Sequence, residues 1–533
     1  MMDRPLMLDR LLQRAATWFG EKEVVTAWEG GARMALPWRE VLERAERVGG
    51  AMAALGVVQG DRVASLAWNT HRHLELYFGV PAAGAILHTV NVRLSPEQVV
   101  RLLRHAGDRV IFADPDQVEA VDAVRDRLPD VERFVVLAGA APPGWEAYET
   151  LLATAPAFDG GPGDDEERAA ALCYTSGTTG EPRGVLYSHR ALVLHTMGIC
   201  LPDAFGLGEA ATILPAVPMF HANAWGLPFA AAMTGATLVL PGPRPSTSHV
   251  ARLLADEGVT FAAGVPTVWL DVLAALRAGG PRPERLRRIH SGGAPTPSGL
   301  VDAWREEIGV EVVTGWGMTE LSPVGMASHP RGRMEGWPDE RLRSVRTAQG
   351  TPLPLVEARI MDASRREVPR DGVTPGELEV RGPWVTAGYF GETVSPLRDG
   401  WLPTGDVATV DADGYVRLVD RSKDLIRSGG EWIASVQLEN ALMDQPGVAE
   451  AAVVAVPHPR WGERPWACVV PRGGAPAVPM ALLEPLRGQV PDWWLPDRVL
   501  VVDAIPRTAT GKFDKKALRD RLAREVERDG TGG

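Results

Sequence analysis

The sequence is poor in cysteine and in lysine, and the shortage of cysteine excludes two classes of structure. Its 533 residues contain three cysteines, at positions 173, 200 and 468. They are too few and too far apart for a disulfide framework or a cysteine-rich zinc site, so we expect reduced thiols and a cytoplasmic protein. Arginine occupies almost every basic position, and the lysines are Lys22, Lys423, Lys512, Lys515 and Lys516.

Positive charge is also in deficit. The 56 Lys and Arg residues face 68 Asp and Glu residues, which gives a net charge of −12. Long-range attraction to nucleic acid or to an anionic membrane surface is therefore not expected, and any phosphate binding must be local. Residues 210–243 carry no Asp, Glu, Lys or Arg, but prolines and glycines interrupt them. This pattern predicts buried strands and turns and no transmembrane segment.

The length and the alternation of patterns indicate more than one domain. A chain of 533 residues exceeds the size at which one core keeps growing, and we find no internal repeat. Helical and strand patterns alternate, which predicts an α/β fold with a large N-terminal domain of mainly parallel sheets flanked by helices. We place it at residues 1–420, with a small β subdomain at about 350–420. A small mobile α+β C-terminal domain follows at residues 421–533.

Several elements can be placed individually. Ser95-Pro96-Glu97-Gln98 resembles a capping box with proline at the first helical position, before a helix that ends at Gly107. Strands are expected at residues 62–68, 110–113, 237–240, 259–261, 288–290 and 310–313. In the C-terminal domain we expect a helix at 434–443, strands at 448–456 and 466–470, and a helix from Lys515. The charged stretch 331–346 is interpreted as a surface loop.

The strongest local motif is a glycine- and hydroxyl-rich segment at residues 174–184, between an expected strand at 169–173 and an expected helix at 188–197. Such a loop can direct N–H groups and hydroxyls at phosphate oxygens. No Gly-Lys-Ser/Thr follows at the spacing of a Walker A motif, which disfavours a P-loop phosphotransferase. The candidate phosphate-binding residues are Thr175, Ser176, Gly177, Thr178, Thr179 and Gly180.

At these residues the sequence resembles the superfamily of acyl-CoA synthetases, firefly-type luciferases and peptide-synthetase adenylation domains, and the resemblance extends over nearly the whole chain. Gly315-Trp-Gly-Met-Thr-Glu320 is similar to the family's adenine and magnesium motif. The resemblance implies that Gly315, Trp316 and Gly317 bind ATP or AMP, with Trp316 against the adenine face. It also implies that Thr319 lies near the α-phosphate and that Glu320 and Thr175 hold magnesium. Thr404-Gly-Asp406 resembles the segment whose aspartate binds the ribose.

The C-terminal motifs carry further implied roles. Asp420-Arg-Ser-Lys-Asp424 resembles the family's hinge, with Asp420 as pivot and with Arg421 and Lys423 at the nucleotide. The loop that lines the pantetheine channel for coenzyme A corresponds to Arg427, Gly429, Gly430, Glu431 and Trp432. Pro506-Arg-Thr-Ala-Thr-Gly-Lys512 resembles the motif whose lysine contacts the substrate carboxylate and α-phosphate. A lysine retained here is notable in a chain so rich in arginine.

The acyl site is indicated by Pro218-Met-Phe-His221-Ala-Asn-Ala-Trp225, which resembles bacterial fatty acyl-CoA synthetases with a gate tryptophan after a substrate-site histidine. The alternative is that Trp225 is simple core packing. Gly293 and nearby small residues leave room for a chain but do not set its length, so short thioether acids, medium-chain acids and aryl acids all remain open.

The resemblance implies an AMP-forming ligase that uses ATP, magnesium and coenzyme A to activate a fatty or other carboxylic acid, with Lys512, Glu320, Thr319 and His221 as catalytic residues. It also implies a homodimer. Arg183 and Arg427 stand where relatives usually carry lysine, so their contacts are open, and no base for the thiol is evident. The alternatives are an adenylating enzyme that loads a carrier protein and a catalytically silent nucleotide-binding homologue.

Overall fold

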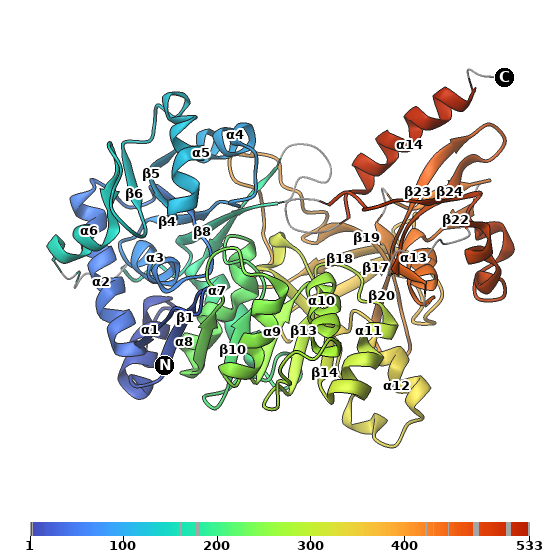
Figure 1. Ribbon diagram of the computed structural model, residues 1–533, viewed down its shortest axis with the longest axis horizontal. Helices are drawn as coiled ribbons and strands as arrows, with labels where there is room; N and C mark the ends of the chain where they lie inside the picture. Colours follow the sequence, from blue (N-terminus) through green and yellow to red (C-terminus); the bar gives the residue numbers. More distant parts are fainter. Residues whose placement is uncertain are drawn as a thin grey trace.

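The first of three sheets in the N-terminal part of the chain has seven strands in the order β7-β6-β5-β3-β4-β8-β9 (Figure 1). The computed structural model describes residues 2–530 except 3, 157, 159–162, 176–181, 422–423, 430, 446, 473–478 and 508–512. Neighbouring strands are parallel except β8 and β9, which are antiparallel. The strands are β3 (Arg62–Leu66), β4 (Ile86–Thr89), β5 (Asp108–Ala113), β6 (Arg133–Val136), β7 (Glu146–Ala147), β8 (Ala169–Tyr174) and β9 (Gly184–Ser188).

The second sheet has nine strands in the order β16-β15-β14-β13-β12-β10-β11-β1-β2. Its centre is parallel, and the antiparallel pairs lie at the two edges. The strands are β1 (Glu23–Ala27), β2 (Arg33–Pro37), β10 (Thr212–Pro215), β11 (Thr237–Leu240), β12 (Phe261–Gly264), β13 (Arg288–Ser291), β14 (Glu311–Gly317), β15 (Val324–Ala327) and β16 (Thr351–Pro352). The predicted α/β class with mainly parallel sheets is confirmed.

Helices join and cover these sheets. One hydrophobic cluster combines side chains of both sheets with those of α1, α2, α3, α7 and α8, so these five helices share a core with the two sheets. The helices are α1 (Asp9–Phe19), α2 (Trp38–Ala54), α3 (His71–Ala82), α4 (Pro96–Ala106), α5 (Val118–Asp122), α6 (Tyr148–Thr154), α7 (His189–Cys200), α8 (Leu227–Thr234), α9 (Thr247–Asp256), α10 (Pro266–Arg277), α11 (Ser298–Ala303) and α12 (Asp339–Arg346).

Helix α4 has the termini that the sequence predicts. The Ser95 hydroxyl accepts from the Gln98 N–H at 3.4 Å, and the Gln98 side chain accepts from the Ser95 N–H at 3.0 Å. Pro96 occupies the first turn, and Gly107 ends the helix with a φ of 65°, in the left-handed region that glycine adopts without steric cost. Strand β5 follows at once, as expected.

Two expectations about local structure are wrong. Residues 210–243 contain β10 and β11 as predicted strands, but their middle forms helix α8, bracketed by Gly226 and Gly235 in the left-handed conformation. In the part of the chain that the structure describes, no helix is long and apolar enough to span a membrane. Residues 339–346, expected in a loop, form helix α12. Acidic residues in its first turn and Arg343 and Arg346 in its last turn suit the helix dipole.

The third sheet is a four-stranded antiparallel sheet in the order β17-β18-β19-β20, in the region where a small β subdomain was expected. Its strands are β17 (Glu357–Met361), β18 (Gly376–Arg381), β19 (Leu402–Val410) and β20 (Val416–Arg421). We call the chain up to Arg421, with these three sheets, the N-terminal unit.

The C-terminal unit, from Asp424, has a five-stranded sheet and lies at the right-hand end of the view in Figure 1. Its elements are β21 (Ile426–Ser428), β22 (Glu431–Ile433), α13 (Ser435–Met443), β23 (Val448–His458), β24 (Gly462–Pro471), β25 (Arg498–Val501) and α14 (Lys515–Gly530). The domain boundary at Asp420 remains our proposal.

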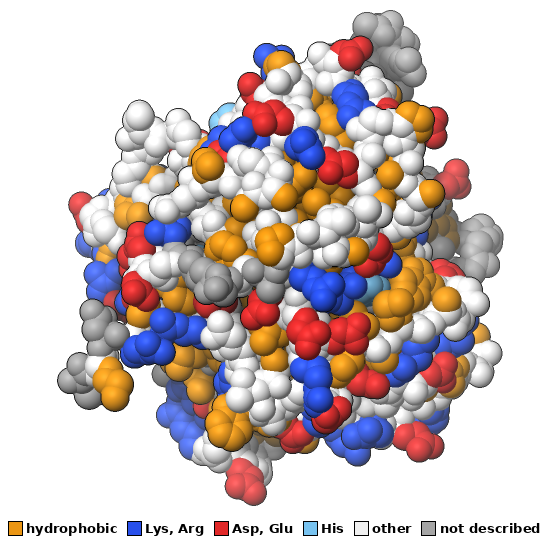
Figure 2. Space-filling model, turned by 90° about the vertical axis from the view of Figure 1, so that its left-hand side faces the viewer, with side chains coloured by type: hydrophobic (Ala, Val, Ile, Leu, Met, Phe, Trp, Pro, Cys, Tyr) orange, Lys and Arg blue, Asp and Glu red, His pale blue; other side chains and the backbone are white. Residues whose placement is uncertain are grey.

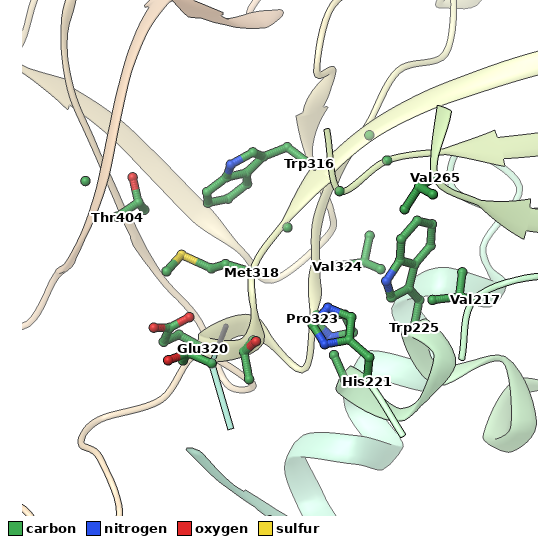
Figure 3. A pocket seen from close by; sticks show the side chains of 18 of the residues that line it. Val217, His221, Trp225, Val265, Trp316, Met318, Glu320, Pro323, Val324 and Thr404 are labelled. Atoms are coloured by element: carbon green, nitrogen blue, oxygen red, sulfur yellow. The ribbon is translucent and has the colours of Figure 1, made fainter. Parts of the chain in front are cut away.

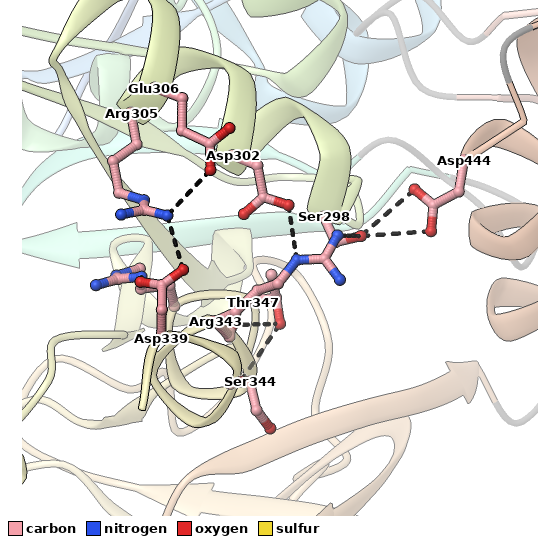
Figure 4. Close-up of polar contacts among 10 residues, drawn as sticks. Ser298, Asp302, Arg305, Glu306, Asp339, Arg343, Ser344, Thr347 and Asp444 are labelled. Carbon is pink, nitrogen blue, oxygen red and sulfur yellow. Dashed lines mark hydrogen bonds and ion pairs between the residues drawn. The ribbon is translucent and has the colours of Figure 1, made fainter. Parts of the chain in front are cut away.

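The two units meet in a polar contact (Figure 4). The Ser298 hydroxyl of α11 lies 3.4 Å from both carboxylate oxygens of Asp444, which follows α13. Arg343 of α12 bonds to Asp302 at 2.6 Å and to Ser298 at 3.0 Å. These groups are exposed to solvent, and exposed polar pairs contribute little stability, so this contact holds the units together weakly.

The surface fits the composition. On the face shown in Figure 2, acidic and basic side chains are interspersed and form no broad field of one sign.

Candidate active site

A cavity of about 630 Å³ lies at the carboxyl ends of the parallel strands of the nine-stranded sheet. Open α/β sheets bind ligands at this edge. The segments that follow β10, β12 and β13 contribute Val217, Val265 and Gly292 to its walls, and β14 itself contributes Trp316. Residues near the phosphate-loop motif and strands β18 to β20 complete the lining, so the cavity lies where three sheets meet.

One end of the cavity is apolar. Figure 3 shows the indole of Trp225 beside Val217 and Val265, with Pro323 and Val324 nearby. A Cβ on Gly292 would lie 3.6 Å from the Trp225 ring, so the missing side chain leaves room beside the indole. This end can accept a hydrocarbon group.

His290 forms the wall behind Trp225. Its ring meets the indole edge-on, with centroids 5.5 Å apart. Burial lowers the pKa of His290 to about 3, so the imidazole is neutral, and its Nδ1 atom has no hydrogen-bond partner among the described residues. A neutral aromatic ring therefore closes the apolar end.

Trp225 is presented by a left-handed turn. The φ angles of Ala222, Asn223, Ala224 and Trp225 lie between 42° and 57°, a conformation that costs an L-residue roughly 1–2 kcal/mol. All four side chains are buried, and Asn223 accepts from the Cys173 thiol at 3.6 Å. The packing of this turn thus holds the indole against the cavity, at a cost in backbone strain.

The other end of the cavity is polar. Figure 3 shows Trp316, Met318, Glu320 and Thr404 there, with His221 between this end and Trp225. His221, Thr319 and Glu320 all line the cavity, so the structure brings together three of the four residues expected to be catalytic. Gly293, Gly315, Gly317 and Thr175 also line it, as expected.

Glu320 is held in place from two sides. Its side chain is buried, and the Tyr389 hydroxyl donates to Oε1 at 2.8 Å. The Thr386 N–H donates to the Glu320 carbonyl at 2.8 Å. Burial, and then the charge of Glu320, raises the pKa of Tyr389, so the phenol stays protonated and remains the donor. The other carboxylate oxygen, Oε2, is not part of this bond and can bind a cation.

The residues present fit a magnesium ion that shares its coordination with a nucleotide. No group of three or more His, Cys, Asp or Glu suited to a metal occurs in the described ranges. Glu320 and the Thr175 hydroxyl, both in the cavity, are hard oxygen donors. Magnesium in nucleotide sites is usually bound by one or two carboxylates together with phosphate oxygens and water, and these donors suit that arrangement.

Arg183, whose contacts the sequence left open, bonds to neighbouring groups. Its guanidinium forms two bonds to Glu392, at 2.7 and 2.6 Å, and lies 3.4 Å above the Tyr389 ring. This planar, bidentate arrangement suits arginine better than lysine. Arg183 therefore supports the tyrosine that holds Glu320.

Asp406 lies behind the indole of Trp316. The Trp316 Nε1–H donates to Asp406 at 2.8 Å, and Arg421 pairs with the same carboxylate at 3.3 Å. Asp406 is not among the lining residues, whereas Arg421 and Trp316 are. The structure thus places Asp406 where it orients the indole, and its expected contact with ribose remains a prediction.

Several expected site residues cannot be placed. Lys512, Lys423, Gly430 and residues 176–180 lie outside the described residues, as does the side chain of Glu431. The ends of the phosphate-loop segment are placed, because Tyr174 pairs with Gly184 and the Thr175 N–H donates to the Arg183 carbonyl. The expected strand at 169–173 and helix at 188–197 are confirmed as β8 and α7, but a strand that was not expected, β9, lies between the segment and the helix. The segment joins two antiparallel strands, and α7 begins only after β9.

The described members of the expected coenzyme A channel lie together on the β21–β22 hairpin. The Arg427 guanidinium lies 4.5 Å above the Trp432 ring, and the Gly429 N–H donates to the Trp461 carbonyl at 2.8 Å. Trp432 is exposed. None of Arg427, Gly429 and Trp432 lines the cavity in this arrangement of the two units.

Sequence reasoning missed several residues of the site. Tyr389, His290 and Arg93 all line the cavity, and Tyr187 donates to the Thr319 carbonyl at 2.6 Å. Arg93, which lies over the rings of Trp68 and Phe220, follows β4 and could have been found from its place after a parallel strand. His290 ends the expected strand at 288–290 and could have been found by the same argument, whereas the sequence contains no comparable signal for Tyr389.

Comparison with known proteins gives consistent matches over the whole chain. The model of the AMP-binding enzyme family matches residues 12–390, and that of the AMP-binding enzyme C-terminal domain matches residues 437–512. A long-chain-fatty-acid–CoA ligase of Thermus thermophilus is 48% identical over 98% of this chain and 96% of its own. A 3-methylmercaptopropionyl-CoA ligase of Ruegeria lacuscaerulensis is 44% identical over 98% of both chains.

Solved structures show the same fold. An anthranilate CoA ligase, AuaEII, in complex with anthranoyl-AMP superposes with a TM-score of 0.89 at 25% identity, over 99% of both chains. ATP-bound MatB from Rhodopseudomonas palustris gives a TM-score of 0.83 at 26% identity, over 97% of this chain and 99% of its own.

Proposed function

The chain belongs to the AMP-binding enzyme family, and from this premise we propose that it is an AMP-forming ligase for a fatty acid. It activates the acid with ATP as an acyl-adenylate and transfers the acyl group to coenzyme A. The observation that carries the proposal is a single cavity with an apolar end at Trp225 and an oxygen-rich end at Glu320. An acid with its chain at the first end would place its carboxylate toward the second.

In the first half-reaction the carboxylate attacks the α-phosphate of ATP and pyrophosphate leaves, so no protein nucleophile is required. Two anions must meet, and the residues of the site supply the opposing potential and the alignment. Trp316, fixed by Asp406, offers its ring to adenine. Thr319 lies beside the reacting phosphate. Magnesium, when bound through Glu320 and Thr175, neutralises charge on the phosphate oxygens.

In the second half-reaction the thiol of coenzyme A attacks the acyl carbonyl and AMP leaves. We propose that Arg427, Gly429, Gly430, Glu431 and Trp432 line the thiol channel after the C-terminal unit has rotated about Asp420. The unit is a mobile domain in this proposal. On resemblance to relatives, we also propose that the protein is a cytoplasmic homodimer.

The products identify the reaction. With magnesium, ATP, coenzyme A and a panel of octanoate, palmitate, 3-methylmercaptopropionate and anthranilate, the protein is expected to release AMP and pyrophosphate in equal amounts with at least one acid. Chromatography of the nucleotides and a coupled pyrophosphate assay measure this. Removing coenzyme A should leave acyl-adenylate formation in place and stop thioester formation. ADP as the product would contradict adenylation.

Trp225 should set which acids are used, because its indole occupies the apolar end of the cavity. Trp225→Ala is expected to shift the ratio of kcat/KM between palmitate and octanoate toward palmitate by at least about tenfold, since a methylene in an apolar pocket is worth about 1–3 kcal/mol. The KM for ATP, bound at the opposite end, serves as the internal control. Equal losses for both acids and for ATP, with a lower Tm, would indicate core packing instead.

A further inference from the structure

Lys515 is a largely buried lysine in a chain that has almost no lysines. It is the first residue of α14, and its side chain is 13% exposed. Nζ lies 2.7 Å from Glu439 and donates to the Ser435 hydroxyl at 2.7 Å. Burial alone would lower the pKa of Lys515, but the carboxylates of Glu439, Asp420 and Asp424 raise it above its usual value. The ammonium is therefore charged.

Ser435 connects this ammonium to Asp420. Its N–H donates to Asp420 Oδ2 at 2.7 Å, and its hydroxyl donates to the same oxygen. The hydroxyl thus donates a hydrogen bond to Asp420 and accepts one from Lys515, so it acts as both donor and acceptor. Asp420, Ser435 and Glu439 are all buried. The result is a continuous buried chain from Asp420 through Ser435 to the Lys515–Glu439 pair.

Asp420 belongs to both units. Its backbone is part of β20, opposite Val407 of β19 in the N-terminal unit. Its side chain is held by Ser435 of the C-terminal unit. Rotation of the C-terminal unit must therefore take place about a residue whose carboxylate is fixed to the moving part.

A second ion pair repeats this arrangement one turn along α14. Arg519 donates to Asp424 at 2.7 Å, and Asp424 is buried. Lys515 and Arg519 are four residues apart, so they lie on one face of the helix. Arg519 thus pairs directly with Asp424, whereas Lys515 pairs with Glu439 and reaches Asp420 through Ser435.

Lys515 is close in sequence to Lys512, so the network that holds Lys515 also restricts where Lys512 can lie. Lys512 lies three residues before it, and three residues of chain span at most about 11 Å. The start of α14 is therefore tied to the pivot at one point and is joined to the segment that carries Lys512 at another. Asp420 and Lys512 are far apart in the sequence, so their separation along the chain gives no sign of this link.

We propose that Lys515 is a positioning residue that, through Ser435, anchors the Asp420 carboxylate to α14 and so fixes the place to which Lys512 is delivered. The inference rests on the proposed function. It assigns to Lys515 a role in adenylation without any contact with substrate. Removing only the cation of a buried ion pair leaves its carboxylate uncompensated and is destabilising, so the test must include a readout that a loss of stability alone does not move.

The test is a double-mutant cycle in the full-length protein, with octanoate, magnesium and ATP, or the most active acid of the panel where octanoate is not used. Lys515→Met is expected to lower single-turnover acyl-adenylate formation at least tenfold, with the KM for ATP unchanged. In a Lys512→Ala background the same substitution should cause no further loss, because the lysine it positions is gone. Lys515→Arg should recover part of the rate. Lys516→Met, the same change at the exposed neighbouring position, is the matched control and should match the wild type.

Two results would overturn the inference: wild-type adenylation in Lys515→Met, or a further tenfold loss in the Lys512→Ala background, which marks a merely structural role. Should Lys515→Met not fold, Ser435→Ala breaks the same link while keeping every charge. It should lower adenylation at least threefold and likewise add nothing to Lys512→Ala, and an additive effect would again reject the proposal. If the wild type itself forms no acyl-adenylate, the proposed function fails instead.

Discussion

Glu320→Gln is expected to lower acyl-adenylate formation by about 10²- to 10³-fold, the scale of losing one preorganised electrostatic contact to a transition state. The substitution keeps the volume and leaves an amide oxygen to accept from the Tyr389 hydroxyl, which now donates to Oε1 at 2.8 Å. The substitution removes the carboxylate charge that would bind magnesium. Single-turnover formation of acyl-adenylate across a magnesium titration measures the effect, and the variant should need more magnesium.

Tyr389→Phe is the graded comparison for Glu320. It keeps the carboxylate and removes only its donor, so it should cost less than Glu320→Gln. Both variants should form thioester from supplied acyl-adenylate at nearly the wild-type rate. If Glu320→Gln keeps adenylation within threefold of the wild type at every magnesium concentration, Glu320 has no part in the first half-reaction.

Lys512→Ala is expected to separate the two half-reactions. Acyl-adenylate formation should fall by about 10²-fold or more, because the meeting of two anions loses a positive charge delivered to it. Thioester formation from supplied acyl-adenylate and coenzyme A should stay close to the wild-type rate, since the C-terminal unit then presents a different face. Rapid-quench measurement of each half-reaction checks both statements.

Lys512→Arg extends this test. The charge is kept, but a planar guanidinium replaces a compact ammonium, so we expect partial recovery at most. This comparison matters in a chain where arginine fills nearly all other basic positions. Equal loss of both half-reactions in Lys512→Ala would reject the separation and, with it, the proposed alternation about Asp420.

Local signals predicted much of the fold. The capping box at Ser95 and Gln98 places α4, because these side chains satisfy the N–H groups that a helix leaves unpaired. The α12 segment was misread, since its charges suit a loop as well as a solvated helix. Helix α8 was missed because it is buried on all sides and shows no amphipathic period.

Site residues that belong to local motifs could be predicted from the sequence, and those brought to the site by tertiary packing could not. The motif at 315–320 led to Trp316 and Glu320, and the one at 218–225 led to Trp225. Tyr389 acts on Glu320 from 69 positions further along the chain, and no local pattern encodes such a contact. The left-handed turn at Ala222 could not be predicted either, because positive φ angles are expected at glycine and this turn has no glycine from Ala222 to Trp225.

The order of the elements after the phosphate-loop segment affects which groups can supply positive potential to the site. A loop that leads directly into a helix gains the partial positive charge of the helix N-terminus, which is permanent. Here β9 follows the segment, and α7 begins only at His189, so the segment does not lead directly into the N-terminus of α7. In the proposed mechanism, magnesium and the Lys512 ammonium supply positive potential, and the ammonium lies on a unit that turns. The electrostatic potential at the phosphates is then a function of domain orientation, and the rotation that opens the thiol channel also weakens the hold on pyrophosphate and AMP.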